Sequence, residues 1–112
     1  MKKKKIKIPI FFGELVIVKT KNLSCLDSKF SFETDNTYAA YAYQHITKKG
    51  IIKYYIVLNP KASIPIITHE CVHIVNFIFK RAGIELDINN DETQAYLTGW
   101  VVEQCCKFLN KK

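Results

Sequence analysis

The chain has 112 residues, of which 48% are hydrophobic and 12% aromatic, a composition that argues against intrinsic disorder. Its length suffices for one two-layer core, so we predict a single domain spanning residues 1–112. The net charge of +7 comes from sixteen lysines and the lone Arg81. Because base-reading sites favour bidentate arginine, this balance makes nucleic acid an unexpected partner.

The chain shows no sign of a membrane span or of a disulfide framework. No run reaches the roughly 18 apolar residues that a membrane span requires, and the basic start does not lead into a signal peptide. None of the four cysteines is in a CxxC pair, which is typical of reduced thiols; they are Cys25, Cys71, Cys105 and Cys106. We therefore expect a cytoplasmic protein with no membrane contact, in which Cys71, Cys105 and Cys106 are packing residues.

The amino-terminal part is predicted to contain two strands. Residues 5–10 and 14–20 alternate or run apolar with β-branched side chains, and Phe11, Phe12 and Gly13 form a plausible turn between them. We interpret the run Lys2–Lys5 as a solvated arm, with a tether for an anionic partner such as nucleic acid as the alternative.

A polar loop and a hairpin follow. Residues 20–37 are irregular, with one short edge segment expected over residues 29–34. Residues 38–46 and 51–59 are both rich in β-forming side chains and flank the turn TKKG, so they predict a β-hairpin.

From Ser63 onward the apolar pattern becomes helical. Ser63 is a suitable N-cap, and Gly83 follows the cationic Lys80 and Arg81, which predicts a helix over residues 64–82. Apolar side chains surround nearly its whole circumference, so we expect a central, buried helix. With Asn90 as its N-cap, a second helix is predicted over residues 91–109. Strands followed by helices indicate the α+β class.

The segment THECVHIVNF places His69 and His73 four residues apart around Glu70. Residues four apart lie on one helix face, so both imidazoles can approach one metal ion. Glu70 is angled away, in reach of a water at that ion. The non-metal alternative is that the histidines are satisfied polar residues on a packed helix. Against it, burying these groups without a shared partner is costly.

Two imidazoles provide half of a tetrahedral zinc site, and a catalytic site needs a third protein ligand. Glu92 lies nineteen residues after His73, in the first turn of the second helix. Ala95 and Gly99 follow on the same face, where small residues would let the two helices approach closely. Asp91 is the competing ligand, and a solvated first-turn acid is the alternative without a metal.

His69, Glu70 and His73 followed by Glu92 resemble the zinc site of the gluzincin metallopeptidases. The segment DETQAYLTGW also resembles the region after the HExxH helix in small metallopeptidase-like proteins of phages and mobile elements. The resemblance covers about residues 52–102. It implies a zincin-like minimal core, with a twisted antiparallel or mixed sheet of three or four strands packed on the HExxH helix. It also implies a phage-encoded protein acting in a bacterial host.

The resemblance further implies a peptidase mechanism in which Zn²⁺ is held by His69, His73 and Glu92. The ion lowers the pKa of its water and polarises the scissile carbonyl, and Glu70 acts as general base. The oxyanion donor stays open among four residues, Tyr96, Tyr41, Tyr43 and His45, although His45 is also a plausible strand surface residue. The expected partner is a peptide or protein substrate, added as a strand beside the last strands.

Two features depart from that family. One turn beyond Glu92, where many gluzincins carry an acid that supports a histidine, this chain has Tyr96, which leaves Asp91 or a backbone carbonyl for that role. The helical subdomain that forms the other cleft wall has no counterpart here, which leaves either shallow substrate binding or a partner protein that completes the cleft. The alternative functions are a catalytically inactive, zinc-stabilised protein-binding domain and a lysine-rich nucleic-acid accessory protein without metal.

Overall fold

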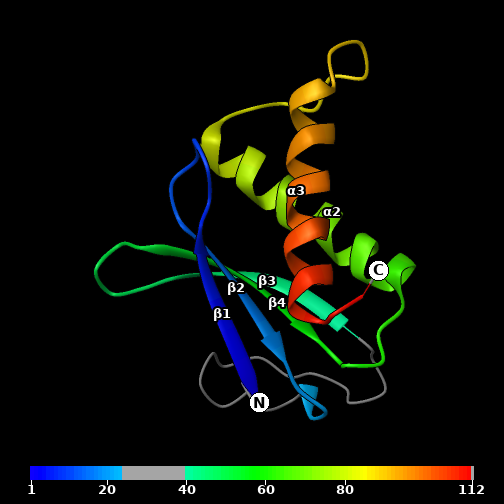
Figure 1. Ribbon diagram of the computed structural model, residues 1–112. Coiled ribbons are helices and arrows are strands. Elements are labelled where there is room, and N and C mark those ends of the chain that lie inside the picture. The colour runs from blue at the N-terminus through cyan, green and yellow to red at the C-terminus, as the bar shows by residue number, and fades with distance from the viewer. Residues whose placement is uncertain (24–39, 112) are drawn as a thin grey trace.

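The computed structural model describes residues 1–23 and 40–111 and contains a sheet with two helices packed on one face (Figure 1). In chain order the elements are β1 (Lys2–Lys7), β2 (Glu14–Lys19), β3 (Ala40–Ile46), β4 (Ile52–Leu58), α2 (Ile64–Ala82) and α3 (Glu92–Phe108). Strands precede helices, so the predicted α+β class is confirmed. The expected edge segment over residues 29–34 and Cys25 lie outside the described residues.

The four strands form one mixed sheet in the order β1-β2-β4-β3. The central pair β2 and β4 is parallel, whereas β1 pairs with β2 and β3 pairs with β4 in antiparallel fashion. The predicted hairpin around TKKG is confirmed, with Ile46 opposite Ile52 and Gly50 at a φ of 83°. A positive φ of this size is readily available to glycine, which explains the turn.

The lysine run is part of the sheet, so the prediction of a solvated arm was wrong. Lys2 pairs with Lys19 and Lys5 with Val16, which makes β1 the neighbour of a strand whose central residues are fully buried. Pairing with β2 satisfies the backbone of β1 while its lysine side chains remain exposed. Lysines along an outer strand also discourage pairing with the sheet edge of another molecule.

The core lies between the sheet and the helices. Alternate residues of β2 and β4 point to the helices, and Leu15 is level with Tyr54 and Ile17 with Ile56. The intervening residues, including Val16 and Val57, are buried on the opposite face. Strands buried on both faces are expected for a central parallel pair.

Helix α2 has the predicted bounds but not the predicted burial. The Ser63 hydroxyl oxygen accepts a hydrogen bond from the Ile66 N–H at 3.4 Å, and Gly83 ends the helix at a φ of 75°. Only one face is in the core, and Val72 is 38% exposed on the other side. The reason is the two-layer architecture, in which the sheet covers one side of α2 and α3 lies beside it, so the outer side meets solvent.

Helix α3 begins after Asp91 rather than Asn90, and Asp91 makes no side-chain capping bond. It contacts α2 through Cys105, whose Sγ is 3.9 Å from the Sγ of Cys71. Ala95 and Gly99 are exposed, and no atom lies within 4 Å of a Cβ built on Gly99. The prediction that α2 and α3 approach closely through these two small residues was therefore wrong. The side chains that α3 directs to the core are Leu97, Val101 and Cys105.

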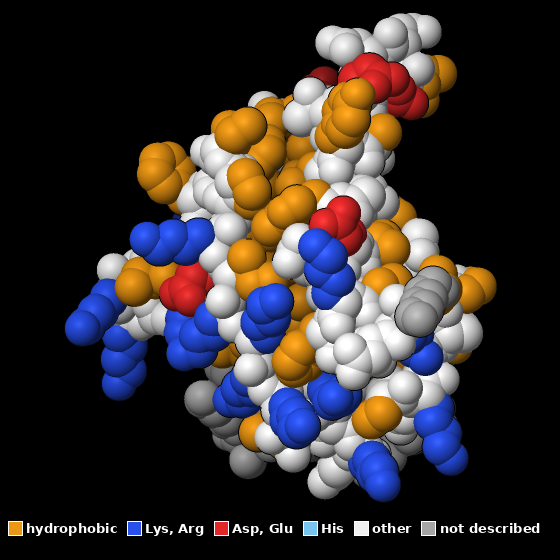
Figure 2. Space-filling model, in the orientation of Figure 1, with side chains coloured by type: hydrophobic (Ala, Val, Ile, Leu, Met, Phe, Trp, Pro, Cys, Tyr) orange, Lys and Arg blue, Asp and Glu red, His pale blue; other side chains and the backbone are white. Residues whose placement is uncertain are grey.

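Charged side chains are unevenly distributed over the surface. Figure 2 shows Lys and Arg side chains gathered over the sheet end of the molecule, whereas acidic side chains are concentrated at the opposite tip. That tip contains the segment before α3 and its first turn, with Asp87, Asp91 and Glu92, all exposed. In the part of the chain that the structure describes, no helix has the length and hydrophobicity needed to cross a membrane.

Candidate metal site

Two imidazoles meet on the outer face of α2. His69 and His73 lie on consecutive turns, and their Nε2 atoms are 3.2 Å apart. Two nitrogens bound to one tetrahedral zinc ion at about 2.0–2.1 Å would be about 3.3 Å apart. The observed separation of 3.2 Å corresponds to an N–Zn–N angle of about 100–106° at those bond lengths. The two rings are therefore spaced for one metal ion without rearrangement of the helix.

The same nitrogens are within hydrogen-bonding distance of each other, with the ring planes inclined by 74°. One neutral imidazole then donates its Nε2–H to the lone pair of the other. Two protonated imidazoles at this distance would repel, because both nitrogens would be donors on positive rings. A metal ion would replace the hydrogen bond by taking both lone pairs.

Glu70 completes a group of three metal-binding side chains with the two histidines, whose ligand atoms all lie within 4.8 Å of one another. Both histidines are exposed and Glu70 is half-buried. Burial raises the pKa of the Glu70 carboxyl, while His73 and His69 lower it. A carboxylate whose pKa moves toward neutrality is a better proton acceptor at neutral pH.

Glu70 lies on the side of α2 that faces β3. Phe77 is two turns further on the same side, and it lines a pocket of about 390 Å³ with Gln44 of β3. Sequence patterns did not single out Gln44 or Phe77, because only packing of the helix on the sheet brings them together. Glu70 is thus partly buried, whereas both histidines are exposed.

Glu92 is not a member of this group. The contact between Cys71 and Cys105 fixes where the helices meet, and Glu92 precedes Cys105 by thirteen residues (92 to 105), about 20 Å along a helix with a rise of 1.5 Å per residue. His73 is only two residues, about 3 Å, from Cys71. Glu92 also belongs to the exposed stripe of α3 that carries Ala95 and Gly99. The structure therefore does not bring the expected third ligand to the histidines.

The other expected site residues are also elsewhere. Asp91 lies beside Glu92 at the acidic tip, and Tyr96 is 76% exposed on the outward stripe of α3. Tyr41, Tyr43 and His45 alternate with the residues of β3 that face the helices, and they are level with Val57, Tyr55 and Lys53. They belong to the opposite face of the sheet, as the burial of Val57 and Tyr55 in the second core cluster shows. The structure thus does not bring these oxyanion candidates to α2.

Cys71 and Cys105 are packing residues, as predicted, whereas Cys106 is half-buried and belongs to neither core cluster. Cys71 and Cys105 are fully buried, and the hydrogen bond between them together with burial raises the pKa of Cys71. Within residues 1–23 and 40–111, Cys71, Cys105 and Cys106 are all free thiols. Protonated, desolvated thiols of this kind are poor metal ligands, because the thiolate is the form that binds.

Comparison of the chain with protein-family models, with curated proteins and with solved structures found no significant match. The spacing of His69, Glu70 and His73 does not by itself identify a gluzincin.

Proposed function

We propose that this protein binds zinc through His69 and His73 and uses Glu70 to hydrolyse peptide bonds. The observation that carries the proposal is the 3.2 Å separation of the two Nε2 atoms on the solvent-facing side of α2. Glu70, with a carboxylate oxygen within 4.8 Å of a ring nitrogen of each histidine, supports the assignment of a base beside the ion.

In this proposal each residue has a distinct task. Bound zinc would supply Lewis acidity, which activates water and polarises a carbonyl group. His69 and His73 would hold the ion with their Nε2 atoms, so both would have to be neutral. A Glu70 carboxylate oxygen takes the proton of the attacking water and passes it to the leaving amine. The half-buried position of Glu70 strengthens this transfer because competing water is partly excluded.

We further propose that an extended peptide lies along β3, the outer strand of the described sheet on the side over which α2 packs. Adding a strand there would satisfy backbone groups of the peptide and leave its scissile bond close to the Glu70 side of α2. A zincin-like arrangement of sheet and helix is part of this proposal.

A second candidate function is favoured by the position of Glu92 far from the histidines. A tetrahedral ion held by two imidazoles keeps two coordination positions, and here these face solvent. A partner protein that offers further ligands would fill them, which makes the ion a bridge between two proteins. This candidate is a zinc-dependent binding domain without catalysis.

The first test is metal content and affinity. Zinc should bind chelator-treated protein at one ion per chain, and His69→Ala or His73→Ala should weaken that binding by at least about tenfold. His45→Ala is the matched control, because it removes the third histidine from the opposite face of the sheet and should leave the affinity unchanged. Equal zinc affinity in the wild type and both α2 variants would overturn the proposal.

Catalysis is tested separately with Glu70→Gln on a peptide library. The variant should keep its zinc and lose turnover, because the amide cannot accept the proton. Zinc binding without turnover in either protein, together with a zinc-dependent complex in size-exclusion chromatography, would favour the binding domain. Turnover that is equal in both proteins would rule out Glu70 as the base.

A further inference from the structure

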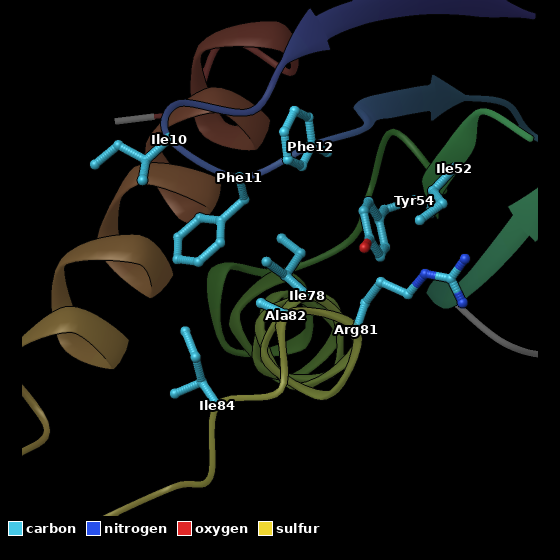
Figure 3. Close-up of a pocket in the computed structure, with 9 residues that line it drawn as sticks. All are labelled: Ile10, Phe11, Phe12, Ile52, Tyr54, Ile78, Arg81, Ala82 and Ile84. Carbon is cyan, nitrogen blue, oxygen red and sulfur yellow. The ribbon is translucent and has the colours of Figure 1, made fainter.

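A second candidate site lies at the end of α2, below the turn at residues 8–13 that connects β1 and β2. This turn is called the hairpin tip. Figure 3 shows a pocket between the tip, β4 and the last turn of α2, with a volume of about 490 Å³. Volumes of roughly 300–1,000 Å³ are usual for small-molecule sites. The lining is apolar except for the Tyr54 hydroxyl and the Arg81 guanidinium; it consists of Ile10, Phe11, Phe12, Ile52, Tyr54, Ile78, Arg81, Ala82 and Ile84.

The hairpin tip is held rigidly against the rest of the molecule. Gly13 has a φ of 108°, and a Cβ at this position would lie 2.9 Å from the Ile52 carbonyl oxygen. The absence of a side chain therefore lets the tip approach β4 closely. Phe11 packs on Phe79 of α2, with ring centroids 6.1 Å apart. The pocket walls are thus fixed by contacts on two sides.

The rim of the pocket exposes large apolar side chains. Ile10 is 97% exposed and Phe12 is 92% exposed. Ile10 also has a φ of 70°, a conformation that a β-branched residue adopts at a cost. A strained residue that buries nothing gains no stability from its side chain, which points to a role in contact with another molecule.

Arg81 is the only charged side chain of the lining. Across residues 1–23 and 40–111 it has no ion-pair partner, since Lys107 with Glu103 is the one salt bridge found there. Burial raises the pKa of the Tyr54 hydroxyl above its ordinary value of 10.0 and the positive charge of Arg81 lowers it, so this hydroxyl is a neutral donor at neutral pH. The pocket therefore offers one neutral donor beside an apolar wall and one exposed cation at its edge, whose guanidinium points past Tyr54 and away from Phe11 and Ile84 (Figure 3).

We propose that this pocket binds a small carboxylate with an apolar body. The hydrocarbon part would contact Phe11, Ile78 and Ile84, while the carboxylate accepts hydrogen bonds from the Arg81 guanidinium and the Tyr54 hydroxyl. A planar guanidinium matches a carboxylate with two parallel bonds. A cationic ligand is repelled by Arg81, and an uncharged apolar one forms no ion pair with its exposed guanidinium. Charge and shape therefore select an apolar monocarboxylate.

This site is independent of the proposed metal centre. Arg81 follows His73 by eight residues, about 12 Å along α2. Binding of a carboxylate is therefore measured in the presence of a chelator, so that failure of the zinc proposal does not affect the result.

Octanoate is the probe, titrated into the full chain by calorimetry and followed by chemical shifts of the Phe11 and Ile84 amides. Octanoate should bind at one site, with octylamine and acetate binding at least about tenfold more weakly, because one has the wrong charge and the other lacks the apolar body. Arg81→Gln should lower octanoate affinity about tenfold, the loss expected for one charged hydrogen-bonding group. Tyr54→Phe should cause a smaller loss.

Lys80→Gln is the matched control. Lys80 is the neighbouring cation on α2 and does not line the pocket, so its loss should leave octanoate affinity unchanged. The proposal is overturned if octanoate shows no saturable binding up to about 10 mM. It is equally overturned if Arg81→Gln binds as tightly as the wild type, or if Lys80→Gln weakens binding as much as Arg81→Gln does.

Discussion

Gly13 offers the sharpest test of how the hairpin tip is held, through the substitution Gly13→Ala. The added Cβ would lie 2.9 Å from the Ile52 carbonyl oxygen and 3.0 Å from Cε2 of Tyr54. Ile52 is paired with Ile46 of β3 and the Tyr54 ring is buried in the core, so neither atom can move freely. The φ of 108° adds a conformational penalty of about 1–3 kcal/mol for a residue with a side chain.

The conformational penalty and the displacement of the Ile52 and Tyr54 atoms by the new Cβ should together lower the free energy of unfolding by about 2–4 kcal/mol. For a chain of this size about 1 kcal/mol corresponds to roughly 4 °C in Tm, so the midpoint should fall by about 8–16 °C. Urea unfolding followed by circular dichroism measures the loss directly, and the m-value should be unchanged because the same surface is exposed on unfolding.

Gly99→Ala is the matched control, since it makes the same chemical change where the surroundings are open. Gly99 lies inside α3, and nothing is within 4 Å of its built Cβ. Alanine there should raise the free energy of unfolding by about 1 kcal/mol through helix propensity. The two variants should therefore shift stability in opposite directions. A loss below about 0.5 kcal/mol in Gly13→Ala would refute the close approach of the tip to β4.

Two further predictions concern strain and pH. Ile10→Asn should stabilise the chain by about 0.5–1 kcal/mol in urea unfolding, because asparagine tolerates the φ of 70° and the 97% exposed isoleucine loses no burial; destabilisation would argue that Ile10 is packed. Cys71, fully buried, has its pKa raised above the ordinary value of 9.0. Above pH 9 the unfolded chain releases this proton and the folded chain keeps it, so stability should fall by about 1.4 kcal/mol per pH unit. Cys71→Ala should flatten that slope, and an unchanged slope would assign the alkaline loss to other groups.

Local sequence signals determined the helices and one hairpin of this protein. The bounds of α2 follow from Ser63 and Gly83, which act on backbone groups a few residues away. The TKKG turn placed β3 and β4 side by side for the same reason. The meeting of His69 and His73 is also a local property, because a spacing of four residues on any helix puts two side chains on one face.

The orientation of each helix was decided by tertiary packing. Apolar residues surround α2 in the sequence, so only contact with the sheet selected the side that is buried and left His69 and His73 exposed. For α3, packing of Leu97, Val101 and Cys105 turned Glu92 and Gly99 outward. The rotation of α3 and its contact point with α2 depend on side chains far apart in sequence, and helical periodicity contains no information about either.

Long-range pairing likewise decided the remaining features. The lysine run forms β1 because its backbone pairs with the edge of β2, although lysine alone is a weak strand former. Arg81, the lone arginine among seventeen basic residues, was an available signal for an anion site. Tyr54 and the hairpin tip come together with it only when helix and sheet pack. Short-range spacing fixed which residues share a turn or a helix face, and burial of apolar surface between distant segments fixed which of those faces meet.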